Sequence, residues 1–313
     1  MKLLALFLVF ATLSCSIVGR PSFPAENVEL LRQDGSTIDF YLQPSAQKNK
    51  ANTLVLYLQG SDCNSVLKDP FLEHHAKSVW PTADWLLIEK RGITADLAHS
   101  FNAERPDCPS KYIEHDNPHQ RVKDIQQVVA HVLRKRTYQN VIAVGGSEGA
   151  VIAAMYAALN EHLSAAVLIN GGGRHFLNDV LHNIRLTAPT EALEEQLNGF
   201  NGFAAHILAA DPFDIQVSNH GYGWWKTMLA LDQQTVLGAI TIPTLIIQGG
   251  RDQSVSPTGV TEMIESLRGE GKTHFDFVVY PDLDHGLMNS VDVSMADTVI
   301  QDVNRWLRDH IGR

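Results

Sequence analysis

The sequence predicts an α/β protein in which a mostly parallel, twisted β-sheet is covered by helices on both faces. Three observations favour this class. Short, almost wholly apolar runs recur along the chain, as expected for strands that are buried on both sides. Segments with helical periodicity separate these runs. Polar, often glycine-containing segments follow the runs, at the sheet edge where such folds place their ligands. With 313 residues, the chain is long enough for one such domain, which we assign to residues 24–313.

The order of these segments supports a single sheet. A hairpin turn signal at Asp34-Gly35 joins the first two predicted strands, and prolines at 106, 109 and 118 exclude a long helix before residue 119. The predicted strands span residues 27–33, 37–42, 54–58, 85–88, 141–144, 165–169, 244–248 and 274–280. Helices are predicted over 120–136, 150–163 and 257–267, with a last helix around 299–307.

Residues 171–240 interrupt this alternation. They contain helix-like patches separated by glycines and prolines, with no buried-strand pattern, so we interpret them as a mainly helical insertion over the sheet. Several aromatic side chains of this segment either line an apolar pocket or form the insertion's own core: Phe200, Phe203, Phe213, Tyr222, Trp224 and Trp225.

The centre of the predicted site is Gly145-Gly146-Ser147-Glu148-Gly149, which fits the pattern Gly-x-Ser-x-Gly. It lies between the strand at 141–144 and a helix rich in small residues. Strand, sharp turn and helix are the context of a nucleophile elbow, in which a serine hydroxyl projects at the carboxyl end of the sheet. The pattern alone has little specificity, and this context makes Ser147 a candidate nucleophile.

A serine nucleophile needs a general base, and a histidine base needs a carboxylate that fixes its tautomer. His285 follows the last predicted strand, and Asp252 follows the strand at 244–248. Both therefore stand at the sheet edge where ligands bind. We predict that Ser147, His285 and Asp252 form a catalytic triad. The alternatives for Asp252 are that it caps the helix that begins near Pro257 or that it pairs with Arg251.

With Ser147, Asp252 and His285 in this order, the chain from about residue 27 to 313 resembles the α/β-hydrolase superfamily. The resemblance implies a hydrolase that forms an acyl-enzyme and uses no metal or organic cofactor. It also implies that the insertion at 171–240 is a cap that shapes the substrate pocket.

The same geometry predicts the oxyanion hole. One donor is the backbone N–H of Glu148, and the other is the N–H of Ser61 in the loop after the strand at 54–58. This loop starts with Gln59-Gly60, where relatives commonly have His-Gly. The carboxylates of Asp62 and Glu148 either point into polar networks or face the pocket, where they would favour a substrate amine.

The amino-terminal residues 1–15 resemble a bacterial signal peptide. Lys2 precedes an apolar run too short to span a bilayer, and the segment before Cys15 is similar to a lipobox, which implies lipid attachment to Cys15. Ordinary cleavage after Ser16 and an unprocessed segment are the alternatives. Export to the periplasmic side of a bacterial envelope leaves Cys63 and Cys108 in an oxidising compartment, where they either form a disulfide or stay unpaired.

Composition narrows the function classes. The formal net charge is −10 and there is no basic cluster, which argues against a nucleic-acid partner. Two cysteines without Cys-x-x-Cys spacing give no zinc signal. We therefore expect an exported serine hydrolase that cleaves carboxylic ester, thioester or amide bonds of a small molecule or short peptide. An aminopeptidase-like enzyme and an inactive binding protein are the alternatives; oligomeric state cannot be read from the sequence.

Overall fold

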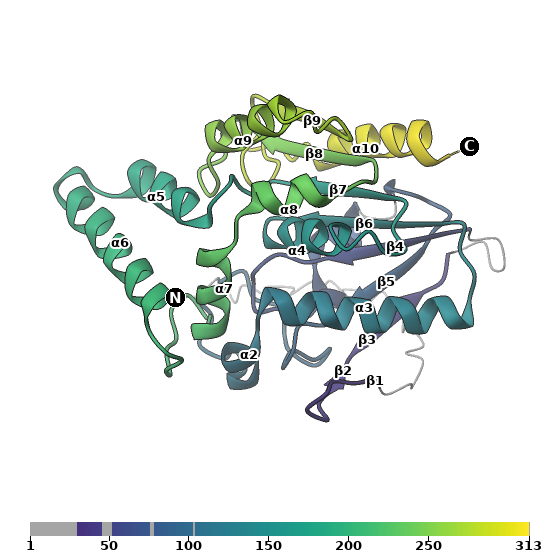
Figure 1. Ribbon diagram of the computed structural model, residues 1–313, viewed down its shortest axis with the longest axis horizontal. Coiled ribbons are helices and arrows are strands. Elements are labelled where there is room, and N and C mark those ends of the chain that lie inside the picture. The colour runs from purple at the N-terminus through teal and green to yellow at the C-terminus, as the bar shows by residue number, and fades with distance from the viewer. Residues whose placement is uncertain (1–29, 46–51, 76–77, 103, 313) are drawn as a thin grey trace, which may run out of the picture.

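The computed structural model describes residues 30–45, 52–75, 78–102 and 104–312, and it confirms the predicted fold class (Figure 1). A seven-stranded sheet forms the centre. Only β3 runs antiparallel to its neighbour, β5, and the other adjacent pairs are parallel. In spatial order the strands are β3 (Phe40–Gln43), β5 (Asp84–Ile88), β4 (Thr53–Leu58), β6 (Asn140–Gly146), β7 (Ala165–Ile169), β8 (Thr244–Gly249) and β9 (Phe275–Tyr280).

Helices cover both faces of this sheet. Strand side chains alternate between two apolar clusters, so that Leu54 and Leu56 join one cluster while Val55 and Tyr57 join the other. Helices α3, α4 and α9 pack in the first cluster, and α1 and α10 in the second. The described helices are α1 (Pro70–His74), α2 (Ser110–His115), α3 (Pro118–Lys135), α4 (Glu148–Ala157), α5 (Phe176–Thr187), α6 (Leu193–Ala209), α7 (Tyr222–Ala230), α8 (Gln233–Ala239), α9 (Pro257–Gly269) and α10 (Ala296–Ile311), with 3-10 turns η1 (Val66–Lys68) and η3 (Thr190–Ala192).

Two predicted elements differ from the structure. The predicted strand at 37–42 is divided into β2 (Thr37–Ile38), which pairs with β1 (Leu30–Leu31) across a turn in which Gly35 has φ +82°, and β3, which joins the main sheet. Helix α4 ends at Ala157, six residues before the predicted end, because Asn160 and His162 adopt positive φ angles that end helical structure. The polar run Asn160-Glu161-His162 interrupts the apolar pattern just past this point.

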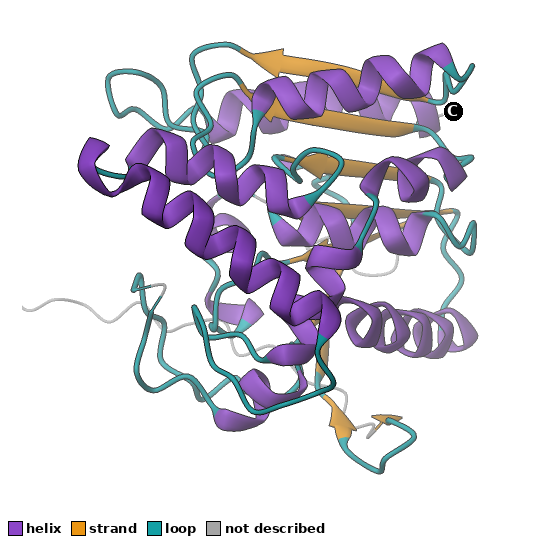
Figure 2. Cartoon of the chain, turned by 60° about the vertical axis from the view of Figure 1, so that its left-hand side comes forward, coloured by secondary structure: helices purple, strands orange, loops and turns teal. Residues whose placement is uncertain are grey.

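Helices α5 to α8 lie between β7 and β8, within the segment predicted as an insertion. In Figure 1, α5, α6 and α7 project at the left, next to the loops that leave β7 and β8; Figure 2 shows α5 and α6 side by side as a hairpin of helices. Asp232 caps α8 by accepting hydrogen bonds from the N–H groups of Gln234 and Thr235. The insertion therefore stands over the edge of the sheet that carries the predicted site residues.

The predicted signal peptide, residues 1–15 with Cys15, lies outside the described residues. None of the helices in the described ranges combines the length and apolar character needed to span a bilayer.

Candidate active site

Ser147 occupies a sharp turn between β6 and α4. Its backbone has φ 54° and ψ −129°, a conformation that costs a non-glycine residue about 1–3 kcal/mol. The N–H of Ser147 donates to the carbonyl of Ile169 at 2.9 Å, which ties the turn to the end of β7. The surrounding structure thus holds this serine in a strained backbone conformation.

Two glycines of the motif make this turn possible. A Cβ on Gly145 would lie 2.1 Å from the carbonyl oxygen of Gly149, and a Cβ on Gly149 would lie 1.9 Å from the carbonyl oxygen of Leu58. Both distances are far below van der Waals contact. The first and last glycines of Gly-x-Ser-x-Gly are therefore required so that β6, α4 and β4 can approach one another here.

The structure brings the three predicted triad residues together. His285 Nε2 lies 3.1 Å from Ser147 Oγ, and His285 Nδ1 lies 2.8 Å from Asp252 Oδ2. Because a carboxylate oxygen only accepts hydrogen bonds, Nδ1 carries the proton, and Nε2 is left to accept the serine hydroxyl proton. The residues come from the loops after β6, β8 and β9, so three distant segments meet at one edge of the sheet.

Asp252 is fixed from several directions. Its side chain is buried, and its Oδ1 accepts from the N–H groups of Ser254 (2.8 Å) and Val255 (3.0 Å). Its Oδ2 accepts from Gln248 Nε2 at 3.2 Å in addition to the bond from His285. The carboxylate therefore has a single orientation, which orients the imidazole in turn. The alternative role as a cap of α9 belongs instead to Ser256, whose Oγ accepts from the N–H of Gly259.

Asn170 joins the loops of the acid and the base, a role that the sequence analysis missed. It is buried directly after β7, with φ 51°. Its Nδ2 donates to the carbonyl of His285 at 2.9 Å, and its Oδ1 accepts from the N–H of Gly249 at 2.8 Å. An asparagine at a strand end, tolerant of positive φ and followed by three glycines, is the sequence signal that points to it.

Helix α5 of the insertion also contacts the loop after β8 that carries Asp252, which we call the acid loop. His182 Nε2 donates to the carbonyl of Asp252 at 3.1 Å, and Asn183 donates to the carbonyl of Gln253 at 3.0 Å. Asp179 is buried at the base of α5 and accepts from the N–H of Ser256 at 2.9 Å. Burial raises the pKa of Asp179 to about 6. The insertion thus stabilises the acid loop as well as standing over the site.

The loop that carries one predicted oxyanion donor, Ser61, passes close to Ser147, and the other, Glu148, follows Ser147 in sequence. A Cβ on Gly60 would be 3.5 Å from Ser147 Cβ, so the loop after β4 passes beside the serine. Glu148 is the first residue of α4, and its N–H has no intrahelical acceptor. Among the hydrogen bonds of the described residues, none uses the N–H of Ser61 or Glu148. Both groups are therefore available to a negatively charged oxygen.

Comparisons with known proteins agree with this geometry. The prolyl oligopeptidase family model matches residues 203–313, while no curated protein matches the chain. An esterase of Pyrococcus furiosus is similar with a TM-score of 0.59 at 14% identity, over 95% of this chain and 96% of that one. An esterase of Butyrivibrio proteoclasticus with bound ferulic acid gives 0.56 at 12%, over 90% and 99%. The acylaminoacyl peptidase of Pyrococcus horikoshii gives 0.56 at 10%, over 90% of this chain and 40% of that one.

The chain has the α/β-hydrolase fold. The acidic residue after Ser147 does not carry a free charge into the pocket. Glu148 is buried, and it accepts from Arg121 Nη1 at 2.6 Å and from Trp224 Nε1 at 2.9 Å. Although burial opposes ionisation, the positive charge of Arg121 lowers the pKa of Glu148. Asp62 is exposed, and its Oδ1 accepts from Gln59 Nε2 and from the N–H of Asn64.

A second buried carboxyl belongs to Asp116, the residue that follows α2. Asp116 is 2% exposed, and neither of its carboxyl oxygens has a hydrogen-bond partner among the described residues. Burial and the negative charge of Glu148 raise the pKa of Asp116 to about 7. His220 lies 3.9 Å away, and burial lowers its pKa to about 4, so the imidazole is neutral at pH 7.

Most aromatic residues of the insertion form its own core. The ring of Phe203 is 5.0 Å from that of Trp225, and Phe176 packs edge-on against Trp224. Trp224 also stacks on His220 at 3.7 Å between ring centroids. Phe213 is partly exposed and packs against Tyr222. The aromatic residues therefore stabilise the insertion and hold it against α2 and α4.

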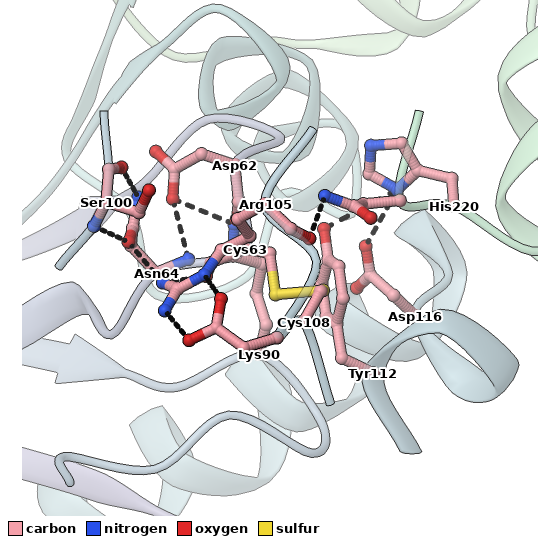
Figure 3. Close-up of a disulfide and its surroundings, with 12 residues drawn as sticks. Asp62, Cys63, Asn64, Lys90, Ser100, Arg105, Cys108, Tyr112, Asp116 and His220 are labelled. Atoms are coloured by element: carbon pink, nitrogen blue, oxygen red, sulfur yellow. Dashed lines mark hydrogen bonds and ion pairs between the residues drawn. A yellow bond between two sulfur atoms is a disulfide. The ribbon is translucent and has the colours of Figure 1, made fainter. Parts of the chain in front are cut away.

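The predicted disulfide is confirmed. Cys63 and Cys108 are bonded, with 5.9 Å between their Cα atoms, and the bond joins the loop after β4 to the segment before α2 (Figure 3). Arg105 reinforces this connection, because its Nη1 donates to the carbonyl of Cys63 at 3.0 Å and to Asn64 Oδ1 at 2.8 Å. In the part of the chain that the structure describes, no group of three His, Cys, Asp or Glu side chains is arranged to hold a metal ion.

Proposed function

We propose that the protein is an exported serine hydrolase that cleaves carboxylic esters through an acyl-enzyme on Ser147. The observation that carries this proposal is the Ser147–His285–Asp252 chain of hydrogen bonds, at 3.1 and 2.8 Å, with Ser147 on a turn of strained backbone conformation. Structural likeness at this identity supports the fold alone, so the activity rests on the geometry of the site.

The geometry supports a two-step reaction. Ser147 Oγ attacks the ester carbonyl carbon while His285 Nε2 accepts the hydroxyl proton, and the N–H groups of Ser61 and Glu148 stabilise the oxyanion. The bond from the carbonyl carbon to the alcohol oxygen breaks, and His285 delivers its proton to that oxygen. Water then attacks the acyl-enzyme with His285 as base, which releases the acid and restores the serine hydroxyl.

One observation favours an ester over a peptide with a free amino terminus. Glu148 is neutralised by Arg121, and Asp62 is engaged within its own loop, so neither carboxylate is free to pair with a substrate ammonium group. The prolyl oligopeptidase family match at 203–313 makes peptide hydrolysis the second candidate.

Steady-state kinetics separates these candidates. We expect p-nitrophenyl esters to be hydrolysed with a kcat/KM at least tenfold above that of aminoacyl p-nitroanilides. We expect Ser147→Ala to remove the activity and Ser290→Ala, a matched change in an exposed loop, to retain it. The reverse substrate preference would establish the peptidase. A folded parent that is inactive on both classes would support the inactive binding protein.

We also propose export to the periplasmic side of a bacterial envelope, with lipid on Cys15 as the anchor. The Cys63–Cys108 disulfide supports an oxidising compartment. The intact mass of the mature protein tests the anchor. A lipid increment on Cys15 is the expected result, and an amino terminus at Ile17 would instead establish ordinary cleavage and no anchor.

A further inference from the structure

A buried ammonium group binds the loop between β4 and η1, residues 59–65, which we call the oxyanion loop. Lys90 follows β5, and its side chain is 1% exposed. Its Nζ donates to the carbonyl of Gly60 at 2.7 Å and also to the carbonyl of Asp62. Figure 3 shows Lys90 beneath this loop, close to Asp62 and the disulfide.

The bond to Gly60 bears directly on the oxyanion hole. The carbonyl of Gly60 and the N–H of Ser61 belong to the same peptide group, which is planar and trans, so that they point in opposite directions. A donor that holds the Gly60 oxygen on the side of Lys90 therefore fixes the Ser61 N–H on the other side. Gly60 lies beside Ser147, and we infer that the oxyanion forms on that side.

The charge of Lys90 adds to this effect. A cation on the carbonyl oxygen withdraws electron density from the peptide group, which makes its N–H a stronger hydrogen-bond donor. The neighbouring peptide is fixed as well, because the hydroxyl of Tyr112 donates to the carbonyl of Ser61 at 2.9 Å. Both peptide groups that flank the Ser61 Cα atom are thereby fixed in orientation.

A purely structural role does not require a charge here. The other end of the loop is held without a cation, since Glu89 accepts from Ser65 Oγ at 2.5 Å and from the N–H of Val66 at 3.0 Å. Burying an ammonium group is costly unless it is paired and hydrogen-bonded. Among the described residues, the ion-pair partner of Lys90 is Asp62, whose Oδ1 lies 3.8 Å from Nζ, and the ring centroid of Tyr112 lies 5.5 Å from Nζ. The charge of Lys90 also acts on the carboxyl groups of Glu89, Asp69, Asp116 and Glu148.

We propose that Lys90 is a positioning residue of the oxyanion hole, which orients and polarises the Gly60–Ser61 peptide so that its N–H stabilises the transition state. This inference rests on the proposed function. It predicts that Lys90 contributes to binding of the tetrahedral oxyanion and not to binding of the uncharged ester.

The test compares Lys90→Met with Lys68→Met. Lys68 makes a similar bond, from its Nζ to the carbonyl of Leu97 at 2.6 Å, but it does not contact the Gly60–Ser61 peptide. We expect Lys90→Met to lower kcat about 10- to 100-fold, part of the effect of losing one oxyanion donor, with KM changed less than about twofold. Affinity for a trifluoromethyl ketone, which forms a tetrahedral adduct with an activated serine, should fall by the same factor. Lys68→Met should leave both values at the parental level.

The outcomes separate this inference from the proposed function. Parental kcat in a folded Lys90→Met protein, or equal losses in the two lysine variants, would overturn the inference while leaving the hydrolase intact. A parent with neither activity nor ketone binding would remove the proposed function and the inference with it. Should Lys90→Met not fold, Lys90→Gln, which keeps N–H donors without the charge, is judged by the same two measurements.

Discussion

The two sides of Ser147 are stabilised by different physical means. The oxyanion side contains buried charged groups: Arg121 pairs with Glu148, Lys90 donates to two carbonyls, and the Asp116 carboxyl has no hydrogen-bond partner among the described residues. On the acid–base side, the buried carboxylate of Asp252 accepts mostly from neutral N–H groups. The stability of the first arrangement changes with the protonation of its charged groups and falls sharply when one partner is removed. The second arrangement rests on several hydrogen bonds that each contribute modestly to stability.

The largest expected effect on stability comes from removing the cation beside Glu148. Arg121→Met leaves a buried carboxylate without its partner, which costs about 3–5 kcal/mol. Urea denaturation measures this loss. Arg32→Met is the matched control, because Arg32 forms another buried pair with Asp124 away from the site.

These two arginine variants separate stability from activity. We expect similar stability losses in both, but a fall in kcat per folded molecule only in Arg121→Met. The double variant Arg121→Met/Glu148→Leu should recover most of the stability, since no charge is then buried alone. Failure of that recovery would show that the pair is not the source of the loss.

Removal of the disulfide should have the next largest effect. Cys63 and Cys108 are 45 residues apart, and closing such a loop stabilises a protein by about 4 kcal/mol at the upper end of the entropic model. We expect Cys63→Ala/Cys108→Ala to lower the free energy of unfolding by up to about that amount. Because Lys90 still holds the loop, kcat should fall less than in Lys90→Met. A larger fall in kcat would make the disulfide the principal support of the oxyanion loop.

The pH dependence of stability tests the titration of the buried Asp116 carboxyl. The pKa of Asp116 is raised in the folded state from 3.8 to about 7, so its stabilising contribution is full below about pH 4 and is lost as pH rises through about 7. Asp116→Asn lacks this titration. Between pH 5 and pH 8, the free energy of unfolding of Asp116→Asn should therefore rise by about 2–3 kcal/mol relative to that of the parent. A pH-independent difference between the two proteins would contradict the predicted titration.

A smaller effect is expected on the acid–base side. Asn170→Gly removes two hydrogen bonds, worth about 1 kcal/mol each, while still allowing positive φ. We expect kcat to fall about tenfold, without the pH dependence of stability that Asp116 confers. Asn170→Asp keeps the acceptor for Gly249 but sets a buried carboxylate oxygen against the carbonyl of His285, so kcat should fall at least as far as in Asn170→Gly. If Asn170→Gly lost as much stability as Arg121→Met, the proposed difference between the two sides of Ser147 would be wrong.

The sequence revealed the fold because buried parallel strands are apolar on both faces. The runs at 54–58 and 165–169 coincide with β4 and β7 to within a residue. It also placed Ser147, Asp252 and His285 at strand ends, where chain order and sheet direction bring residues together. These signals are local, and each can be read within one segment.

The residues that the sequence analysis missed act through partners that are distant along the chain. Lys90 bonds to a backbone carbonyl 30 positions away, and Arg121 pairs with a glutamate 27 positions away. Neither pairing leaves a periodic or spaced pattern in the sequence. Any residue type can supply a backbone carbonyl, and the direction of a side chain at a strand end depends on the conformation of the loop. Such contacts follow only from the three-dimensional arrangement.

Labelling with a fluorophosphonate probe tests the central claim most directly, because the probe reacts with an activated serine whatever the substrate. The parent, oxidised protein should be labelled, with the adduct mapped by peptide mass to Ser147. Ser147→Ala should not react, and folded His285→Ala and Asp252→Asn should react at least 100-fold more slowly, in line with about 10⁴-fold losses in related triads. An unlabelled parent that is folded and oxidised, or an adduct on another serine, would contradict the account.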